Sequence, residues 1–153
     1  MKKPISTRTH GIIDYGWAAL ATAFAEQVNG ATDTARLLRA AAAAATSSSL
    51  VTNYEYGVLR VMPMRGHLAL DFALSGALLL SPLFLPQSER RHVWRPVLLG
   101  AAGLVTGLLT KTRSPHELGD EFAGLHGGSR EVSMVADQTL DAAVSPHLRP
   151  HLE

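Results

Sequence analysis

A histidine is followed four residues later by an aspartate at two places in the chain: His10 with Asp14, and His67 with Asp71. Residues four apart lie on the same face of a helix, so each pair would present an imidazole beside a carboxylate. Imidazole nitrogen suits zinc, copper, iron or nickel, and carboxylates can complete the coordination shell. A divalent metal site is therefore one interpretation, and a proton relay through the same groups is a variant of it.

A structural interpretation competes with the metal site. Each aspartate would accept hydrogen bonds from a helix N-terminus, from its own histidine or from the other half of the chain, and would so fix the register of the helices. The sequence favours this interpretation, because His-x-x-x-Asp is not a specific metal signature. A haem held between His10 and His67 has no attachment motif to support it. We therefore predict no cofactor, with a divalent metal as the alternative.

The two pairs belong to an internal repeat with an offset of 57 residues. Four residues of the first half find a counterpart in the second, the last with one further residue of slip: His10 with His67, Asp14 with Asp71, Tyr15 with Phe72, and Thr52 with Thr110. Each half has two apolar stretches, which predicts a hairpin of two helices in each repeat. The repeats would cover about residues 8–57 and 65–113 of one domain, residues 1–113.

Four stretches are apolar and poor in charge, namely residues 9–25, 40–54, 66–88 and 96–110. A soluble bundle needs a charged stripe on its outer faces, and the second and fourth stretches contain no charged residue. We therefore predict an all-α fold, a four-helix transmembrane bundle built from two tandem two-helix repeats. A bilayer needs roughly 20 helical residues, and only the third stretch is comfortably long enough. A soluble bundle of buried helices is the alternative.

The end of the chain differs from the body in charge. Residues 1–113 carry 12 Lys and Arg against 6 Asp and Glu, whereas residues 114–153 carry 2 against 7. We predict a soluble acidic tail with one or two short helices, the first begun by a capping box from Ser114 to Glu117. The absence of cysteine excludes thiol chemistry and Cys-based zinc or iron–sulfur sites.

Other polar residues should gather at the end of the bundle that carries the two His/Asp pairs. Five of them form the predicted structural polar layer: Tyr15, Asn53, Tyr54, Glu55 and Arg60. For Glu55 we expect a salt bridge to Arg60 that pins the loop between the two halves. Thr9 and Thr32 are the expected N-caps of the first two helices.

Several motifs resemble the SPW repeat family of bacterial membrane proteins: His10-Gly-Ile-Ile-Asp14-Tyr15, Leu50 to Gly57, Pro63-Met64, and His67-Leu-Ala-Leu-Asp71. The resemblance covers about residues 8–112 and implies two-helix repeats in a four-helix protein of the bacterial inner membrane. The naming triplet departs here, with Ser81-Pro82-Leu83 in the second half and Phe24-Ala25-Glu26 in the first. The excess of Lys and Arg near the helix ends on the side of the two chain termini favours a cytoplasmic location for both termini. The family brings no established activity.

No phosphate-binding loop, dinucleotide fingerprint, zinc-protease motif or nucleophile elbow is present in the sequence, so no enzyme class is supported. Small residues at Ala40–Ala45 and at Gly100, Gly103 and Gly107 would let helices approach closely in lipid. We expect a non-enzymatic accessory, assembly or scaffold component, as a homo-oligomer or a subunit of a larger membrane complex, with lipid and no nucleic acid as partners. The alternative is a metal- or proton-handling binding or transport protein.

Overall fold

The computed structural model describes residues 3–28 and 32–117. The chain divides into two compact units, Met1–Glu117 and Leu118–Glu153, and the second unit lies outside the described residues. The tail helices predicted beyond Glu117 therefore lie outside them as well. The start of the predicted capping box is described, and the backbone N–H of Glu117 donates to the Ser114 hydroxyl at 3.2 Å.

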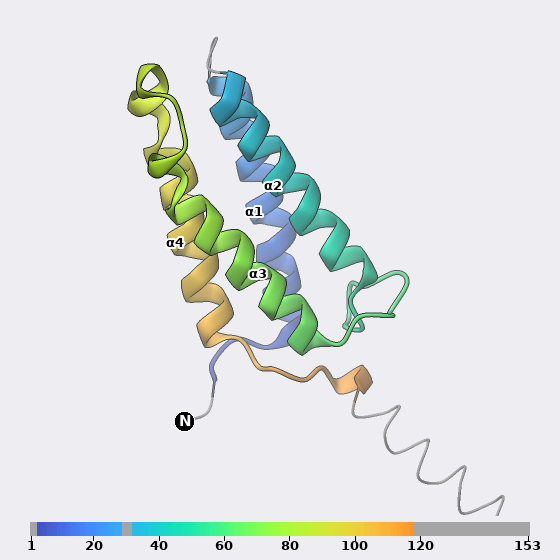
Figure 1. Cartoon of the computed structure of the whole chain (residues 1–153). Helices are drawn as coiled ribbons and strands as arrows, with labels where there is room; N and C mark the ends of the chain where they lie inside the picture. Colours follow the sequence, from blue (N-terminus) through green and yellow to red (C-terminus); the bar gives the residue numbers. More distant parts are fainter. Residues whose placement is uncertain (1–2, 29–31, 118–153) are drawn as a thin grey trace, which may run out of the picture. The chain divides into compact units, whose positions relative to one another are not determined.

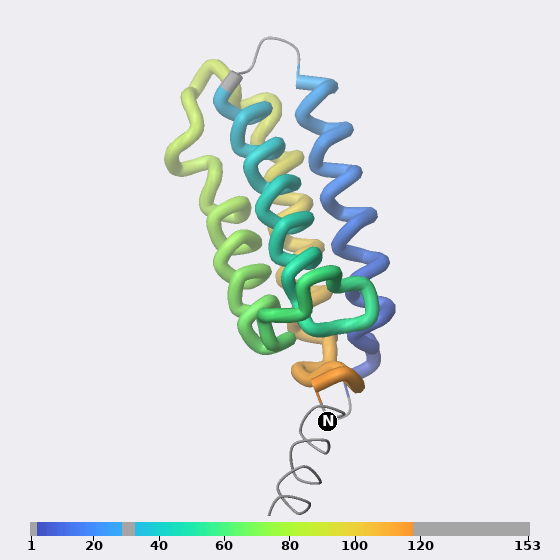
Figure 2. The backbone as a smooth tube through the Cα atoms, turned by 90° about the vertical axis from the view of Figure 1, so that its right-hand side faces the viewer, coloured from blue at the N-terminus to red at the C-terminus, as the bar shows by residue number. Residues whose placement is uncertain are grey.

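Four α-helices build the first unit (Figure 1): α1 (Thr7–Gln27), α2 (Thr32–Val51), α3 (Met64–Leu79) and α4 (Trp94–Leu109). Two short 3₁₀ helices, η1 (Ser81–Leu83) and η2 (Gln87–His92), connect α3 to α4. Helix α1 packs closely on α2, and α3 on α4, so that two antiparallel hairpins lie side by side with their turns at the same end (Figure 2). The all-helical fold of two hairpins is confirmed.

Among residues 3–28 and 32–117, no helix is at once long enough and apolar enough to cross a membrane. The third apolar stretch, which the sequence offered as the longest, does not form one helix. Helix α3 ends at Leu79, and a 3₁₀ turn begins at Ser81, because Pro82 has no backbone N–H to continue the helix. The transmembrane location of the bundle stays a prediction.

The start of α1 differs from the prediction. Ser6, not Thr9, is the N-cap, and its hydroxyl accepts the backbone N–H of Thr9 at 3.1 Å. Ser6 has the extended backbone conformation that an N-cap residue adopts. The helix therefore begins at Thr7, two residues before the apolar stretch does.

The repeat is visible in how the two halves are joined. The segment before each hairpin pairs with the end of the other hairpin, through matched backbone hydrogen bonds: Ile5 to Leu109 at 3.1 Å and Lys111 to Ile5 at 3.0 Å, then Met62 to Val51 at 2.9 Å and Asn53 to Met62 at 2.7 Å. Each set makes a short parallel bridge. The two halves thus exchange equivalent contacts, as expected for an approximate two-fold relation.

The bundle has two hydrophobic clusters. The larger lies toward the hairpin turns and is rich in small residues: Ala18, Ala21, Ala25, Val28, Leu38, Ala41, Ala42, Ala45, Leu78 and Leu99. The smaller lies at the opposite end and consists of Tyr54, Met64 and Leu68, with Phe72 packed against it. The His/Asp pairs lie beside the smaller cluster, since Tyr54 stacks on His67. Helices α3 and α4 approach closely nearer the hairpin turns, where Gly100 faces Ser75 and Leu79 without a side chain.

Candidate metal centre

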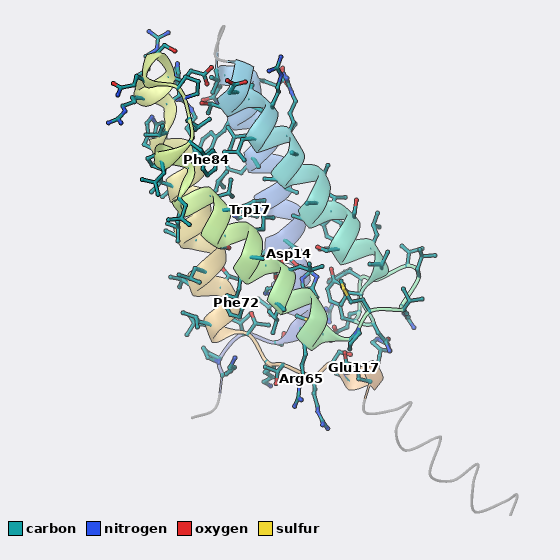
Figure 3. All side chains as sticks on the ribbon, in the orientation of Figure 1. Asp14, Trp17, Arg65, Phe72, Phe84 and Glu117 are labelled. Atoms are coloured by element: carbon teal, nitrogen blue, oxygen red, sulfur yellow. The ribbon has the colours of Figure 1, made fainter. Side chains whose placement is uncertain are left out.

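The structure brings all four predicted residues together. His10 and Asp14 project from α1, and His67 and Asp71 project from α3, so that one donor atom from each lies within 4.8 Å of the others. The imidazoles are 1% and 0% exposed, and the carboxylates are 13% exposed each. Asp14, labelled in Figure 3, lies within the bundle. This buried cluster could hold a metal ion.

The shortest contacts join one half of the chain to the other. Nε2 of His10 lies 3.0 Å from Oδ2 of Asp71, and Nε2 of His67 lies 2.9 Å from Oδ2 of Asp14. The contacts within each helix are longer, at 3.3 Å in α1 and 3.2 Å in α3. The two Nε2 atoms are 3.2 Å apart. Each aspartate thus contacts the histidine of its own helix and that of the other hairpin.

These separations match the edges of a small tetrahedron. Zinc binds nitrogen and oxygen at about 2.0–2.1 Å, and tetrahedral geometry then separates any two ligands by about 3.3 Å. The five measured separations in the cluster run from 2.9 to 3.3 Å. Five of the six separations among the four donors therefore have the length of the edges of a tetrahedral site, and the sixth, between the two carboxylates, is no longer than 4.8 Å.

Two threonines fix which nitrogen of each imidazole carries its proton. The Thr110 hydroxyl donates its only hydrogen to the Thr106 carbonyl at 2.7 Å, and the Thr52 hydroxyl donates to the Ser48 carbonyl at 2.6 Å. Each hydroxyl oxygen can then only accept a hydrogen bond from the Nδ1 atom that it contacts. These Nδ1 atoms lie 2.8 Å from Thr110 and 3.1 Å from Thr52. Both rings are held with Nδ1 protonated.

In the neutral form of either ring, Nε2 therefore carries a lone pair directed at the cluster. Two carboxylate oxygens then face two nitrogen lone pairs at about hydrogen-bond distance, and acceptors in such contact repel unless positive charge lies between them. Two added protons supply that charge by turning both rings into imidazolium ions. One divalent cation supplies the same charge and balances the two carboxylates, as metal sites with neutral histidine ligands do.

Burial and charge act on His67 in opposite directions. Burial lowers the pKa of its imidazole, but the hydrogen bond to Asp14 and the charges of Asp71 and Asp14 raise it by more. The pKa of His67 therefore lies above its ordinary value of 6.5. The Tyr54 ring stacks on the same imidazole, with centroids 5.9 Å apart and planes at 27°. This packing helps to fix the orientation of the His67 ring, and the Tyr54 ring itself lies against Gly11 of α1.

One element of the site breaks the two-fold relation. The hydroxyl of Ser49 donates to Oδ2 of Asp14 at 3.3 Å. The repeat places Gly107 at the matching position of α4, and a side chain there would contact the Phe72 ring, whose ε carbon lies 3.0 Å from the Cβ position. Asp14 and Asp71 are therefore supported by different neighbours.

Of the five residues of the predicted polar layer, Tyr54 contacts His67, and one expected contact needs correction. Glu55 does not pair with Arg60. Its two carboxylate oxygens accept the Thr7 hydroxyl at 3.1 and 2.9 Å, where an anion near the start of α1 is also favoured by the helix dipole. Arg60 lies in a turn with a φ of 48° and donates to the Gly57 carbonyl at 3.4 Å.

Tyr15 and Asn53, two further residues of the layer, take part in hydrogen bonds that involve the backbone. The Tyr15 hydroxyl donates to the Tyr56 carbonyl at 3.4 Å. The Asn53 carbonyl accepts the Ser114 hydroxyl at 2.6 Å. Glu117 mirrors Glu55 in the second half, because its carboxylate accepts the backbone N–H of Met64 at the start of α3.

Three members of the site were not predicted from the sequence: Thr52, Thr110 and Ser49. The two threonines were matched by the repeat but were not connected to the histidines. The signal that could have found them is the repeat match itself, which places one threonine just after the second helix of each hairpin. Each threonine contacts the histidine of the other hairpin. Ser49 has no equivalent in the second half and so gives no repeat signal.

No family model, no curated protein and no solved structure matches this chain.

Proposed function

We propose that the protein binds one divalent transition-metal ion of the zinc type between its two hairpins, and that the ion joins the halves of the repeat. The single observation that carries the proposal is the pair of fixed imidazoles. Thr110 and Thr52 hold the Nδ1 protons, so that both Nε2 lone pairs point at the two carboxylates, at distances of 3.0 and 2.9 Å across the hairpins. Metal-binding histidines are oriented in the same way, by a hydrogen bond from the other ring nitrogen.

The donor set favours a particular class of ion. Two imidazoles and two carboxylates suit zinc, cobalt, iron or nickel, whereas magnesium and calcium prefer shells of oxygen alone. Four protein donors fill a tetrahedron, which is the arrangement of zinc sites that stabilise folds. Two of the donors come from α1 and two from α3, so a bound ion would cross-link the hairpins and stabilise the folded state.

The test is a metal titration of the full-length protein after removal of metal with a chelator. Zinc and cobalt binding would be measured by competition with a chromogenic chelator, and stability by thermal unfolding. We expect one ion per chain and a higher melting temperature with metal. At a concentration of 100 times Kd, a ligand that binds only the folded state adds about 2.7 kcal/mol to the free energy of unfolding.

The matching variant is the double substitution Asp14→Asn and Asp71→Asn, which keeps the shape of both side chains and removes both charges. It should lose stoichiometric binding while it keeps its helical circular dichroism. The control is Asp33→Asn, which changes an exposed ion pair with Arg36 (46% and 74% exposed). The proposal is wrong if the wild-type protein binds neither zinc nor cobalt at micromolar concentration.

A second candidate is an accessory or scaffold subunit, and a specific surface feature favours it. At least half of each of several large apolar side chains on the helices is exposed: Ile12 at 58%, Leu70 at 51%, Leu98 at 50%, Val105 at 55% and Leu108 at 57%. Extended apolar surface of this kind is generally covered by lipid or by another subunit. Recovery of the untagged protein as a monomer in a detergent-free supernatant, with no crosslinked partner in native membranes, would remove this candidate.

A further inference from the structure

A small cavity lies directly beside the four donors, on the side of the hairpin turns. Three donor residues line it, namely His10, Asp14 and Asp71, and its apolar wall includes Trp17, Ala45 and Leu74. Its volume is about 30 Å³. The cavity is therefore part of the inner surface of the proposed metal centre, and it separates the centre from the larger hydrophobic cluster.

His67 does not line this cavity. Its imidazole stacks on Tyr54, which does not line the cavity either. In a tetrahedron of four donors, the other three then form the face that opens to the cavity. A ligand that approached the ion through this face would lie on the side of the ion opposite His67. The three lining donors would then surround the ion, between this ligand and His67. Zinc sites expand from four to five ligands in this way.

The size and lining of the cavity restrict what such a ligand can be. One water needs roughly 10–15 Å³ of this volume, and a cavity that takes benzene has about 150 Å³. A volume of 30 Å³ therefore admits a ligand of one to three non-hydrogen atoms. The nearest indole N–H, on Trp17, already donates to the Leu99 carbonyl at 3.0 Å. Ser75 and Thr106 also line the cavity with uncharged hydroxyl groups, so the ion would be the cationic partner of the ligand.

We propose that the metal centre has an exchangeable fifth position in this cavity, opposite His67, which takes a small oxygen- or nitrogen-donor ligand such as water or a linear anion of two or three atoms. This inference rests on the proposed metal site. It changes what that site is for, because a purely structural centre has a closed shell, whereas a centre with an exchangeable position can bind or sense a small molecule.

The test uses the full-length protein loaded with cobalt, and azide as the probe. Four-coordinate cobalt absorbs visible light much more strongly than five-coordinate cobalt. We expect azide to lower this absorption in a saturable manner, with one azide per cobalt, and removal of azide by desalting to restore the original spectrum with the cobalt still bound. Metal analysis after desalting shows whether azide has only extracted the ion.

The matched variants act on the cavity and leave the four donors unchanged. Ala45→Leu fills the cavity from α2, whereas Ala44→Leu adds the same side chain at an exposed position one residue away. Ala45→Leu should keep the azide-free cobalt spectrum and weaken azide binding at least tenfold, and Ala44→Leu should change neither. If Ala45→Leu does not fold, Gly103→Ala replaces it, because its new Cβ lies against the flexible Ser75 hydroxyl and 3.7 Å from the Trp17 indole nitrogen.

The outcomes separate this inference from the proposed function. A wild-type protein that fails to bind cobalt contradicts the metal site itself. A cobalt protein whose spectrum does not respond to azide keeps the metal site and overturns the fifth position. Equal azide affinity in the wild-type and cavity-filled proteins also overturns it, because the ligand then binds elsewhere. Loss of cobalt to azide counts against it as well, since no stable adduct forms.

Discussion

The Nδ1 atom of His10 lies 2.8 Å from the hydroxyl oxygen of Thr110, a residue 100 positions later in the chain. The second half repeats the relation between His67 and Thr52 at 3.1 Å. In both cases the threonine comes from the end of one hairpin and the histidine from the start of the other. The hydrogen bonds that orient the candidate ligands therefore exist only when the two hairpins are docked.

Removal of one of these hydroxyls should weaken metal binding without removing a ligand. In Thr110→Val, the shape of the side chain is kept, but His10 loses the acceptor for its Nδ1–H. Loss of such a partner commonly reduces metal affinity about 10–100-fold, and we expect a reduction of this size, measured by chelator competition with zinc. Thr52→Val should behave in the same way.

Thr46→Val is the matched control for this prediction. The Thr46 hydroxyl donates to the carbonyl four residues earlier, on Ala42, at 2.9 Å, as Thr110 does on Thr106, but the contact includes no histidine. The control should bind zinc with wild-type affinity. An equal loss of affinity in Thr46→Val and Thr110→Val would show that the effect comes from the helix and not from the imidazole.

The metal-free protein should become less stable as the pH rises through neutrality. The raised pKa of His67 means that the protonated ring is stabilised in the folded state. That contribution is complete below the unfolded pKa of about 6.5 and is lost as the pH rises through the folded pKa. Urea unfolding of metal-free protein should therefore give a lower free energy of unfolding at pH 8 than at pH 6.

Zinc should reverse this trend. The metal requires the deprotonated ring nitrogens, so its stabilising effect should grow between pH 6 and pH 8, where the protons that it replaces are lost. In His67→Gln, both the decrease without metal and the increase with metal should be reduced. A metal-free wild-type protein that gains stability over this pH interval would contradict the charge arrangement that we assign to the cluster.

The position of the candidate site could be predicted from the sequence because the His/Asp pair occurs once in each half of the internal repeat. Two His/Asp pairs at helical spacing and at one repeat offset must lie on equivalent helices, so their convergence follows from a hairpin that is repeated. The sequence could not decide between an anchor and a metal site. The proposal of a metal site depends on which imidazole nitrogen is protonated, and the hydroxyls of Thr52 and Thr110 that bear on this reach the histidines only through the docking of the hairpins.

Other features depended on contacts that no local pattern contains. The pairing of Glu55 with Arg60 was predicted from their closeness in sequence, but Glu55 contacts Thr7 from the start of the chain. Likewise, nothing near Glu89 indicates that it reaches the start of α2, 55 residues earlier. Long-range hydrogen bonds of this kind are set by the packing of whole helices, so local sequence signals do not reveal them.

Glu89 should connect the two hairpins at the end away from the candidate metal site. Its buried carboxylate in η2 accepts the Thr34 N–H at 2.8 Å, the Thr34 hydroxyl at 2.7 Å and the Asp33 N–H at 3.3 Å. It therefore caps α2 from the other half of the chain. Glu89→Gln keeps the size of the side chain and removes its charge, and loss of such a cap costs about 1 kcal/mol, measurable by urea unfolding at pH 7.

The same residue gives a prediction for acid. Burial raises the pKa of Glu89, but the hydrogen bonds from Thr34 and Asp33 lower it by more, so that it lies below its ordinary value of 4.5. Its contribution is complete above that value and is lost as the pH falls through the folded pKa. The difference in the free energy of unfolding between the wild-type protein and Glu89→Gln should therefore become smaller in acid. A Glu26→Gln control, at an exposed ion pair with Arg39, should change stability little at any pH.

Close packing of α3 on α4 should depend on the absence of a side chain at Gly100. A Cβ there would lie 2.7 Å from the Ser75 carbonyl oxygen and 2.9 Å from the Leu79 nitrogen, both backbone atoms of α3. Gly100→Ala must push the helices apart, and overpacking of this kind costs about 1–3 kcal/mol. Gly76→Ala is the control, because its Cβ meets nothing within 4 Å, and alanine stabilises a helix interior by about 0.5–1 kcal/mol relative to glycine. In urea unfolding, Gly100→Ala should lower the free energy of unfolding and Gly76→Ala should raise it. A stabilising Gly100→Ala would mean that the two helices are not in contact at this position.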